Sequence, residues 1–160
     1  MERQRLIRRV RGWLSVVILA LVVSGVTAFP LETELEWVVR HVDWVPLPRL
    51  VAWLHRVHEG LAVTNRAYQF LAYGTDWLAF AHLVLAVLFV GPWRDAVRNK
   101  WVIEFGLVAC GGVLLLALIA GPVRGIPFYW RMIDCSFGVF GAVPLWLSLR
   151  DVGRIERLGG

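Results

Sequence analysis

Four apolar stretches, with basic residues on alternating sides of them, constrain the fold of this chain more than any other feature. They run over residues 13–29, 72–90, 101–121 and 132–149. A helix needs about 20 mainly apolar residues to cross the roughly 30 Å hydrocarbon core of a bilayer. Hydrophobic residues make up 58% of the 160 residues, more than in an ordinary soluble domain. We therefore predict an all-α integral membrane bundle of four transmembrane helices, forming one membrane domain over residues 1–160.

The basic residues predict which ends of the spans face the cytoplasm. Residues 1–12, 91–100 and 150–160 carry eleven of the seventeen lysines and arginines. Because Lys and Arg flank the cytoplasmic ends of membrane helices, we expect these segments and both termini in the cytoplasm. The first stretch also resembles a signal peptide with a cleavage site at residues 26–28. We favour a retained span, because the apolar run continues beyond the usual length of a signal-peptide core.

A long outer segment, residues 31–70, separates the first two spans. Apolar residues recur in it at helical spacing on both sides of Pro46 and Pro48, with charged residues between them. The segment also holds three of the nine tryptophans, a residue that prefers the headgroup region of a membrane. We predict one or two amphipathic helices that lie on the outer membrane surface.

Ionisable residues within spans are costly and are candidates for function by default. Asp76 and Asp134 fall near the outer N-termini of the second and fourth spans, where a carboxylate also stabilises a helix end. The functional alternative is an outward-facing polar pocket that also contains Arg124, Trp130 and Arg131. Such a pocket would bind an anionic headgroup or relay protons, with Asp76 and Asp134 as catalytic candidates.

Two further ionisable residues lie deeper in the spans. His82 is a third catalytic candidate and follows Asp76 by about two helical turns. It could donate a hydrogen bond to a neighbouring helix, or it could ligate haem or a pigment. No cofactor is predicted, because the spans contain no second histidine for a bis-histidine haem site. Glu104 follows Lys100 by four residues, and we expect these two side chains to form a surface ion pair.

His55 and His58 form a pair at helical spacing in the outer segment. Residues three positions apart lie on one face of a helix and could share a metal ion. No third ligand follows at a spacing known from zinc sites, unless His41 or Glu59 completes the site. We therefore predict no metal site and keep His55 and His58 as candidate ligands.

Three segments resemble those of small, uncharacterised bacterial multi-pass membrane proteins. They are GTDWLAFAH (Gly74–His82), GPWRDAVRNKWVIEFG (Gly91–Gly106) and RGIPFYWRMIDCSFG (Arg124–Gly138). No activity is attributed to those proteins. The resemblance therefore implies architecture only, and it implies no site residues. We expect the chain to lie in the bacterial inner (cytoplasmic) membrane.

The expected function is that of a non-enzymatic subunit or scaffold of a membrane complex. Its partners would be the lipid bilayer and other membrane subunits, or further copies of the chain. Two alternatives stay open: a small transporter or membrane-embedded enzyme with an outward-facing polar site, and a pigment- or haem-binding subunit that uses His82. The net charge of +5 is explained by basic residues that flank the spans, so nucleic acid is excluded as a partner.

Overall fold

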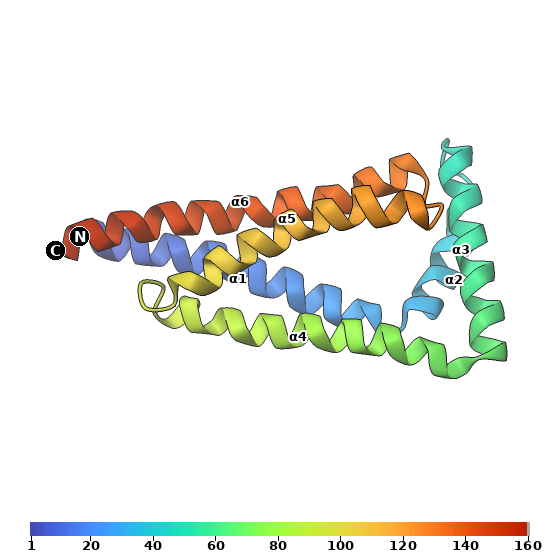
Figure 1. The fold of residues 1–160 in the computed structure, drawn as a ribbon, viewed down its shortest axis with the longest axis horizontal. Helices are drawn as coiled ribbons and strands as arrows, with labels where there is room; N and C mark the ends of the chain where they lie inside the picture. The colour runs from blue at the N-terminus through green and yellow to red at the C-terminus, as the bar shows by residue number, and fades with distance from the viewer. Residues whose placement is uncertain (160) are drawn as a thin grey trace. The chain divides into compact units, whose positions relative to one another are not determined.

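The computed structural model describes residues 1–159, which are mostly helical and contain no strand. The all-α class is confirmed, with 88% of the residues in helices. The elements are α1 (Glu2–Ala28), α2 (Leu31–His41), α3 (Pro48–Ala67), a 3₁₀ turn η1 (Gln69–Ala72), α4 (Tyr73–Arg94), α5 (Lys100–Val123) and α6 (Phe128–Gly159) (Figure 1).

Four helical segments are long and apolar enough to cross a membrane, as the sequence predicted. They are Glu2–Ala28, Gln69–Arg94, Lys100–Val123 and Phe128–Leu158. Among the described residues, forty large apolar side chains are exposed, whereas sixteen hydrophobic residues form the core. Water would penalise so much exposed apolar surface, but the hydrocarbon of a bilayer would not. This distribution is compatible with a membrane protein.

The chain divides into two compact units. The first contains Met1–Ala20 and the chain from Ala86 onward, and the second contains Leu21–Leu85. Helices α1 and α4 each begin in one unit and end in the other. The prediction of one membrane domain stays a prediction.

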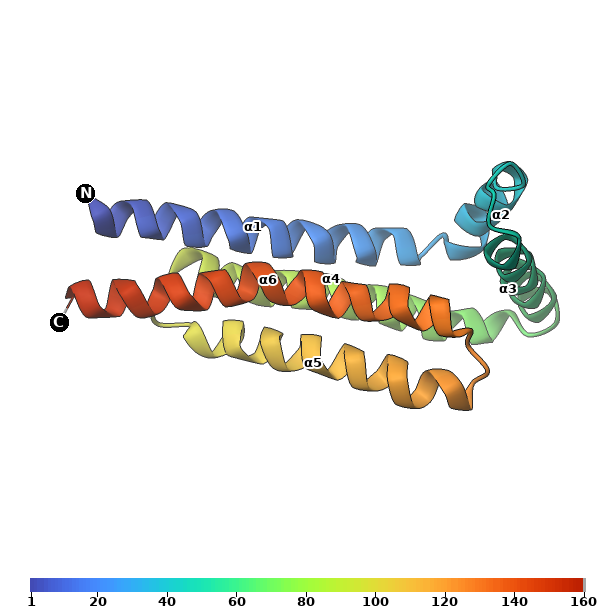
Figure 2. The same ribbon diagram turned by 90° about the horizontal axis from the view of Figure 1, so that it is seen from above.

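Helices α5 and α6 form an antiparallel pair in the first unit, side by side in both views (Figures 1 and 2). Glycines permit this close packing. A Cβ atom on Gly106 would lie 2.8 Å from Phe89 and 2.9 Å from Leu145, and one on Gly138 would lie 2.7 Å from the Cys110 carbonyl oxygen. These glycines therefore allow helices of the same chain to pack closely, whereas small residues in membrane helices can also serve contacts with a partner.

A tight turn joins α5 to α6. The backbone N–H of Ile126 donates to the Gly121 carbonyl at 2.9 Å, and that of Gly125 donates to the Pro122 carbonyl at 3.0 Å. These two bonds are those of a Schellman motif, which satisfies the last carbonyls of a helix. Gly125 has a φ of 69°, a conformation that glycine adopts without steric cost.

Two of the helices extend beyond the predicted spans. Helix α1 starts at Glu2 rather than near residue 13, because Leu6, Val10 and Leu14 are buried on one face of its arginine-rich first turns. Helix α6 continues to Gly159 rather than residue 149, because Val152 and Ile155 are also buried. Both extensions add apolar contacts outside the most apolar stretches.

The second unit contains two helices in residues 31–70, α2 and α3, so the predicted helical structure of this segment is confirmed, whereas its place on the outer membrane surface stays a prediction. Helices α2 and α3 pack together, and Asn65 of α3 donates a hydrogen bond to the Glu32 carboxylate of α2. In both views α3 runs across the direction of the first turns of α4 (Figures 1 and 2). The end of α1 packs closely on α4, because a Cβ atom on Gly25 would lie 2.9 Å from the Ala79 carbonyl oxygen.

Candidate functional site

Asp76 lines a cavity of about 310 Å³ within the second unit. The cavity lies among the start of α2, the last turns of α3 and the start of α4. Its polar lining residues are Glu32, Thr33, Thr64, Asn65, Thr75 and Asp76. The polar surroundings of Asp76 therefore include residues of α2 and α3, which sequence reasoning did not connect with it.

Two carboxylates reach this cavity from helix N-termini. Glu32 lies in the first turn of α2 and Asp76 in the first turn of α4. Each carboxylate there lies near the positive end of a helix dipole. Asn65 satisfies one oxygen of Glu32 by donating a hydrogen bond. The arrangement offers acceptor groups for a small polar or cationic molecule.

Arg124, Trp130, Arg131 and Asp134 belong to the first unit, around the turn between α5 and α6. The guanidinium of Arg131 lies 5.3 Å from the centre of the Phe128 ring. Its aliphatic part covers Gly121, where an added Cβ atom would lie 2.5 Å from Arg131 Cδ. Among the described residues no ion pair joins Arg131 to Asp134.

These four residues are close in sequence and share one helix–helix connection. Asp76 belongs to the other unit. The predicted common pocket of Asp76 with Arg124, Arg131 and Asp134 therefore stays a prediction.

His82 donates a hydrogen bond from Nδ1 to the Leu78 carbonyl oxygen, at 2.7 Å. The acceptor belongs to α4 itself, so the expected bond to a neighbouring helix is replaced by one within the same helix. A proton on Nδ1 leaves Nε2 as the acceptor nitrogen. That tautomer is the one a histidine needs to ligate a metal through Nε2.

The two histidines considered as metal ligands, His55 and His58, have different surroundings. His55 Nε2 lies 3.0 Å from the Asp43 Oδ1 atom, in an exposed contact between α3 and the loop before it. His58 is half-buried one turn further along α3. Within residues 1–159, no group of three or more His, Cys, Asp and Glu side chains is arranged to hold a metal ion.

Sequence reasoning missed Asp151, the one carboxylate of the described chain that is fully buried. Three arginines surround it: Arg9 Nε lies 3.4 Å from Oδ2, and nitrogen atoms of Arg150 and Arg154 lie 3.9 Å from Oδ1. None of these contacts has hydrogen-bond geometry, and neither carboxylate oxygen accepts a hydrogen bond from a described residue. Asp151 is thus a buried counter-ion for arginines of both α1 and α6.

A sequence pattern could have identified Asp151. It follows Ser148 by three residues and precedes Ile155 by four, spacings that place all three on one helix face. Ser148 and Ile155 are buried, as is Leu145 three residues before Ser148. The prediction ended the span at residue 149 and therefore assigned this face to the cytoplasmic tail.

The expected pair between Lys100 and Glu104 is wrong. Lys100 Nζ lies 3.0 Å from Glu156 Oε2, so it joins the start of α5 to the end of α6. Glu104 is exposed one turn further along α5. The partner of Lys100 lies far away in the sequence, where helical spacing gives no information.

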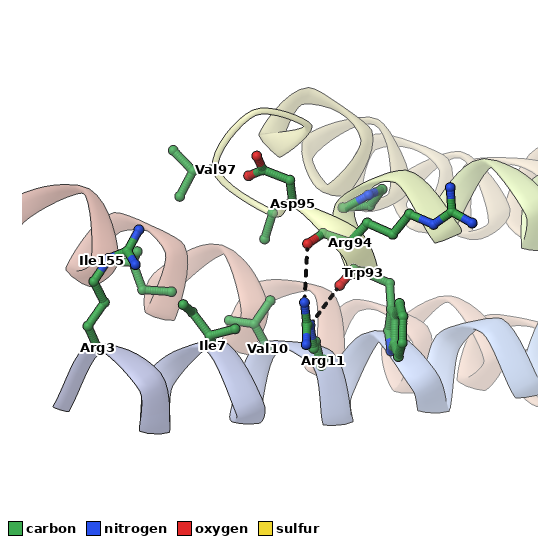
Figure 3. Close-up of a pocket in the computed structure, with 11 residues that line it drawn as sticks. Arg3, Ile7, Val10, Arg11, Trp93, Arg94, Asp95, Val97 and Ile155 are labelled. Carbon is green, nitrogen blue, oxygen red and sulfur yellow. Dashed lines mark hydrogen bonds between the residues drawn. The ribbon is translucent and has the colours of Figure 1, made fainter. Parts of the chain in front are cut away.

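Arg11 links α1 to the end of α4 within the first unit. Its Nε atom donates to the Trp93 carbonyl at 3.1 Å, and Nη2 donates to the Arg94 carbonyl at 3.4 Å (Figure 3). Its guanidinium also lies 5.2 Å from the Trp93 ring centre, and the Trp93 indole N–H donates to Ser15 at 3.0 Å. Arg11 satisfies carbonyls that a helix end otherwise leaves unpaired.

Comparison with protein-family models, with curated proteins and with solved structures finds no match to this chain.

Proposed function

We propose that the protein is a multi-pass protein of the bacterial inner membrane, with both termini in the cytoplasm, that serves as a non-enzymatic subunit or scaffold of a membrane complex. Eleven of the seventeen basic residues lie in residues 1–12, 91–100 and 150–160, which favours this orientation. The partner would be another membrane subunit or a second copy of the chain.

The exposed face of α5 carries the proposal. Val108, Leu115 and Ile119 lie along it at helical spacing and are 62–74% exposed. Gly111 and Gly112 lie between them, and an added Cβ atom at either position would meet nothing within 4 Å. Helices associate in membranes through small residues that allow close backbone approach. In contrast to Gly106, these two glycines are not used for packing within the first unit.

Polar side chains support the same proposal, because several of them form contacts between helices of the same chain. Arg9 contacts Asp151, Arg11 bonds the end of α4, and Lys100 pairs with Glu156. The surface that remains along the spans is mainly apolar, as expected of a protein that contacts lipid and other spans.

The test is native mass spectrometry of the chain extracted from its own membrane in a mild detergent. Wild type is expected to retain a protein partner. Gly111→Leu together with Gly112→Leu should release this partner, because two large side chains would prevent the close helix approach that the glycines allow. Ala81→Leu is the matched control, since Ala81 is exposed on α4. A lone wild-type chain, or equal retention by all three proteins, would contradict the scaffold role.

The polar cavity of the second unit favours a second candidate, a small transporter or membrane-embedded enzyme. Asp76 and Glu32 would supply its ligand or proton acceptors. Asp76→Asn should then abolish proton-coupled uptake of the substrate into proteoliposomes and leave assembly intact. Glu34→Gln is the control, because Glu34 lies outside the cavity lining.

The tautomer of His82 favours the remaining alternative, a haem- or pigment-binding subunit. Its Nε2 atom would be the ligand, with the Nδ1 bond to Leu78 fixing the ring. A visible absorption band in the purified protein that His82→Ala removes, and that His58→Ala preserves, would support it.

A further inference from the structure

Exposed aromatic side chains form a row along the first turns of α4, where the chain has turned out of α3 through η1 (Figure 1). Tyr73, Trp77 and Phe80 are 52–61% exposed. Their rings meet edge to face, with centroids 6.0 Å apart in both the Tyr73–Trp77 pair and the Trp77–Phe80 pair. Val84 continues the row and is 48% exposed. Spacings of four, three and four residues place these side chains on one side of the helix, here called the aromatic face of α4.

The polarity of the side chains falls along the aromatic face from the start of α4 inward. Tyr73 carries a hydroxyl group and Trp77 an indole N–H, whereas Phe80 and Val84 have no polar side-chain atom. Within residues 1–159 the Tyr73 hydroxyl and the Trp77 indole N–H make no hydrogen bond. Both polar groups are therefore available to water or to lipid headgroups, and the two side chains below them need an apolar environment.

The aromatic face contains neither a charged nor a small side chain. Asp76 instead lines the cavity of the second unit, and His82 lies about two and a half turns from Tyr73, on the opposite side of α4. Helices that associate in membranes approach each other through small residues, such as those on the exposed face of α5. Three aromatic rings in a row would hold a partner helix away, whereas fluid acyl chains can fill the spaces beside them. The face is therefore suited to lipid rather than to a second helix.

We infer that the aromatic face of α4 contacts the phospholipid bilayer, with Tyr73 and Trp77 at the level of the outer headgroups and Phe80 and Val84 in the hydrocarbon. Tyrosine and tryptophan gather at membrane interfaces, because their side chains are apolar at one end and polar at the other. The segment that contains the row, Gln69–Arg94, is long and apolar enough to cross a membrane. Such anchors set the depth and rotation of a membrane helix. The inference rests on the membrane location proposed above, but not on the scaffold role.

The assigned depth has a consequence for Asp76. This residue lies between Tyr73 and Trp77 in the first turn of α4, so its carboxylate would be at headgroup level, within reach of water. An ionised carboxylate costs much less there than in the hydrocarbon.

The experiment is fluorine NMR of the full chain in phosphatidylcholine nanodiscs, with fluorinated tryptophan in place of tryptophan. The resonance of Trp77 is assigned by its loss in Trp77→Phe. Val84→Trp in that background moves the label about 10 Å deeper along the helix, at 1.5 Å per residue. A lipid nitroxide at the start of the acyl chain should broaden the Trp77 resonance more than a nitroxide at the end of the chain. This order should reverse for the label at position 84.

Two controls accompany this comparison. A water-soluble gadolinium chelate should broaden the Trp77 resonance and leave the label at position 84 sharp. Phe80→Trp conserves an exposed ring, so it tests an intermediate depth even where Val84→Trp does not fold.

Three results would overturn the inference. If the nitroxides and the chelate all leave the Trp77 resonance sharp, a protein surface covers the aromatic face, although the membrane location stands. If the two nitroxides act in the same order on labels at positions 77, 80 and 84, the assigned depths are wrong. If the chelate broadens all three labels, the face lies in water and the membrane location of α4 fails with it. Loss of the protein partner alone leaves the order of broadening unchanged, so failure of the scaffold role is distinguishable.

Discussion

The buried carboxylate of Asp151 allows a quantitative prediction. Its side chain is fully buried, whereas the side chains of Arg9, Arg150 and Arg154 are 40–48% exposed. At an effective dielectric constant of about 20, two unit charges 4 Å apart interact by about 4 kcal/mol. Partial hydration of the arginines, their mutual repulsion and the desolvation of the carboxylate all reduce the net value.

We expect Asp151→Asn to lower the free energy of unfolding by about 2 kcal/mol. This value lies between the ~1 kcal/mol of an exposed pair and the roughly 3–5 kcal/mol lost when one partner of a buried pair is removed. The exposed arginines can be rehydrated, which keeps the cost below the upper limit. For a chain of this size the melting temperature should fall by about 4–8 °C.

The assay is thermal unfolding in a mild detergent, followed by circular dichroism at 222 nm. Glu156→Gln is the matched control, because it also converts an acid of α6 to an amide but breaks an exposed pair with Lys100. It should change stability by less than about 0.5 kcal/mol. Arg9→Gln should cost less in the Asp151→Asn background than in wild type, with a coupling above about 0.5 kcal/mol. If Asp151→Asn and Glu156→Gln have the same melting temperature, the counter-ion role of Asp151 is refuted.

Two further predictions concern glycines of the first unit. Gly106→Leu should destabilise the fold by about 1–3 kcal/mol or more, because its side chain would overlap Phe89 and Leu145. Gly111→Leu should leave the melting temperature of the isolated chain unchanged. A similar loss of stability in Gly106→Leu and Gly111→Leu would contradict the view that only Gly106 is needed for packing within the first unit. Gly125→Ala should cost about 1 kcal/mol, because alanine resists a φ of 69°. The expected loss corresponds to about 2–4 °C per kcal/mol in a chain of this size, so a melting temperature within 1 °C of wild type would show that the turn relaxes.

The sequence predicted the class of fold because hydrophobicity acts locally. Each span is a continuous run of apolar residues, so its existence can be recognised without knowing its neighbours. The amphipathic helices α2 and α3 were predicted for the same reason, since their apolar residues recur at helical spacing. The ends of α1 and α6 were missed because Leu6 and Ile155 are buried among charged residues, where a hydropathy average stays low.

Partners that are distant in sequence could not be predicted. Lys100 was assigned to Glu104 by the i, i+4 rule, yet its carboxylate partner lies on another helix. Likewise, nothing in the segment around Asp76 indicates that Glu32 and Asn65 line the same cavity. Such contacts depend on how helices pack, and a single sequence carries no direct record of helix packing.

The pairing of Arg9 with Asp151 has a consequence for the order of assembly during synthesis. Arg9 lies near the start of the chain and Asp151 near its end, so this contact has a very large sequence separation. Contacts between neighbouring segments such as α5 and α6 form sooner than those that must close most of the chain into a loop. The arginines of α1 would therefore leave the ribosome long before their counter-ion is made. Until α6 is inserted they would be held by water and lipid headgroups, and the ion cluster would close only after the last span is in place.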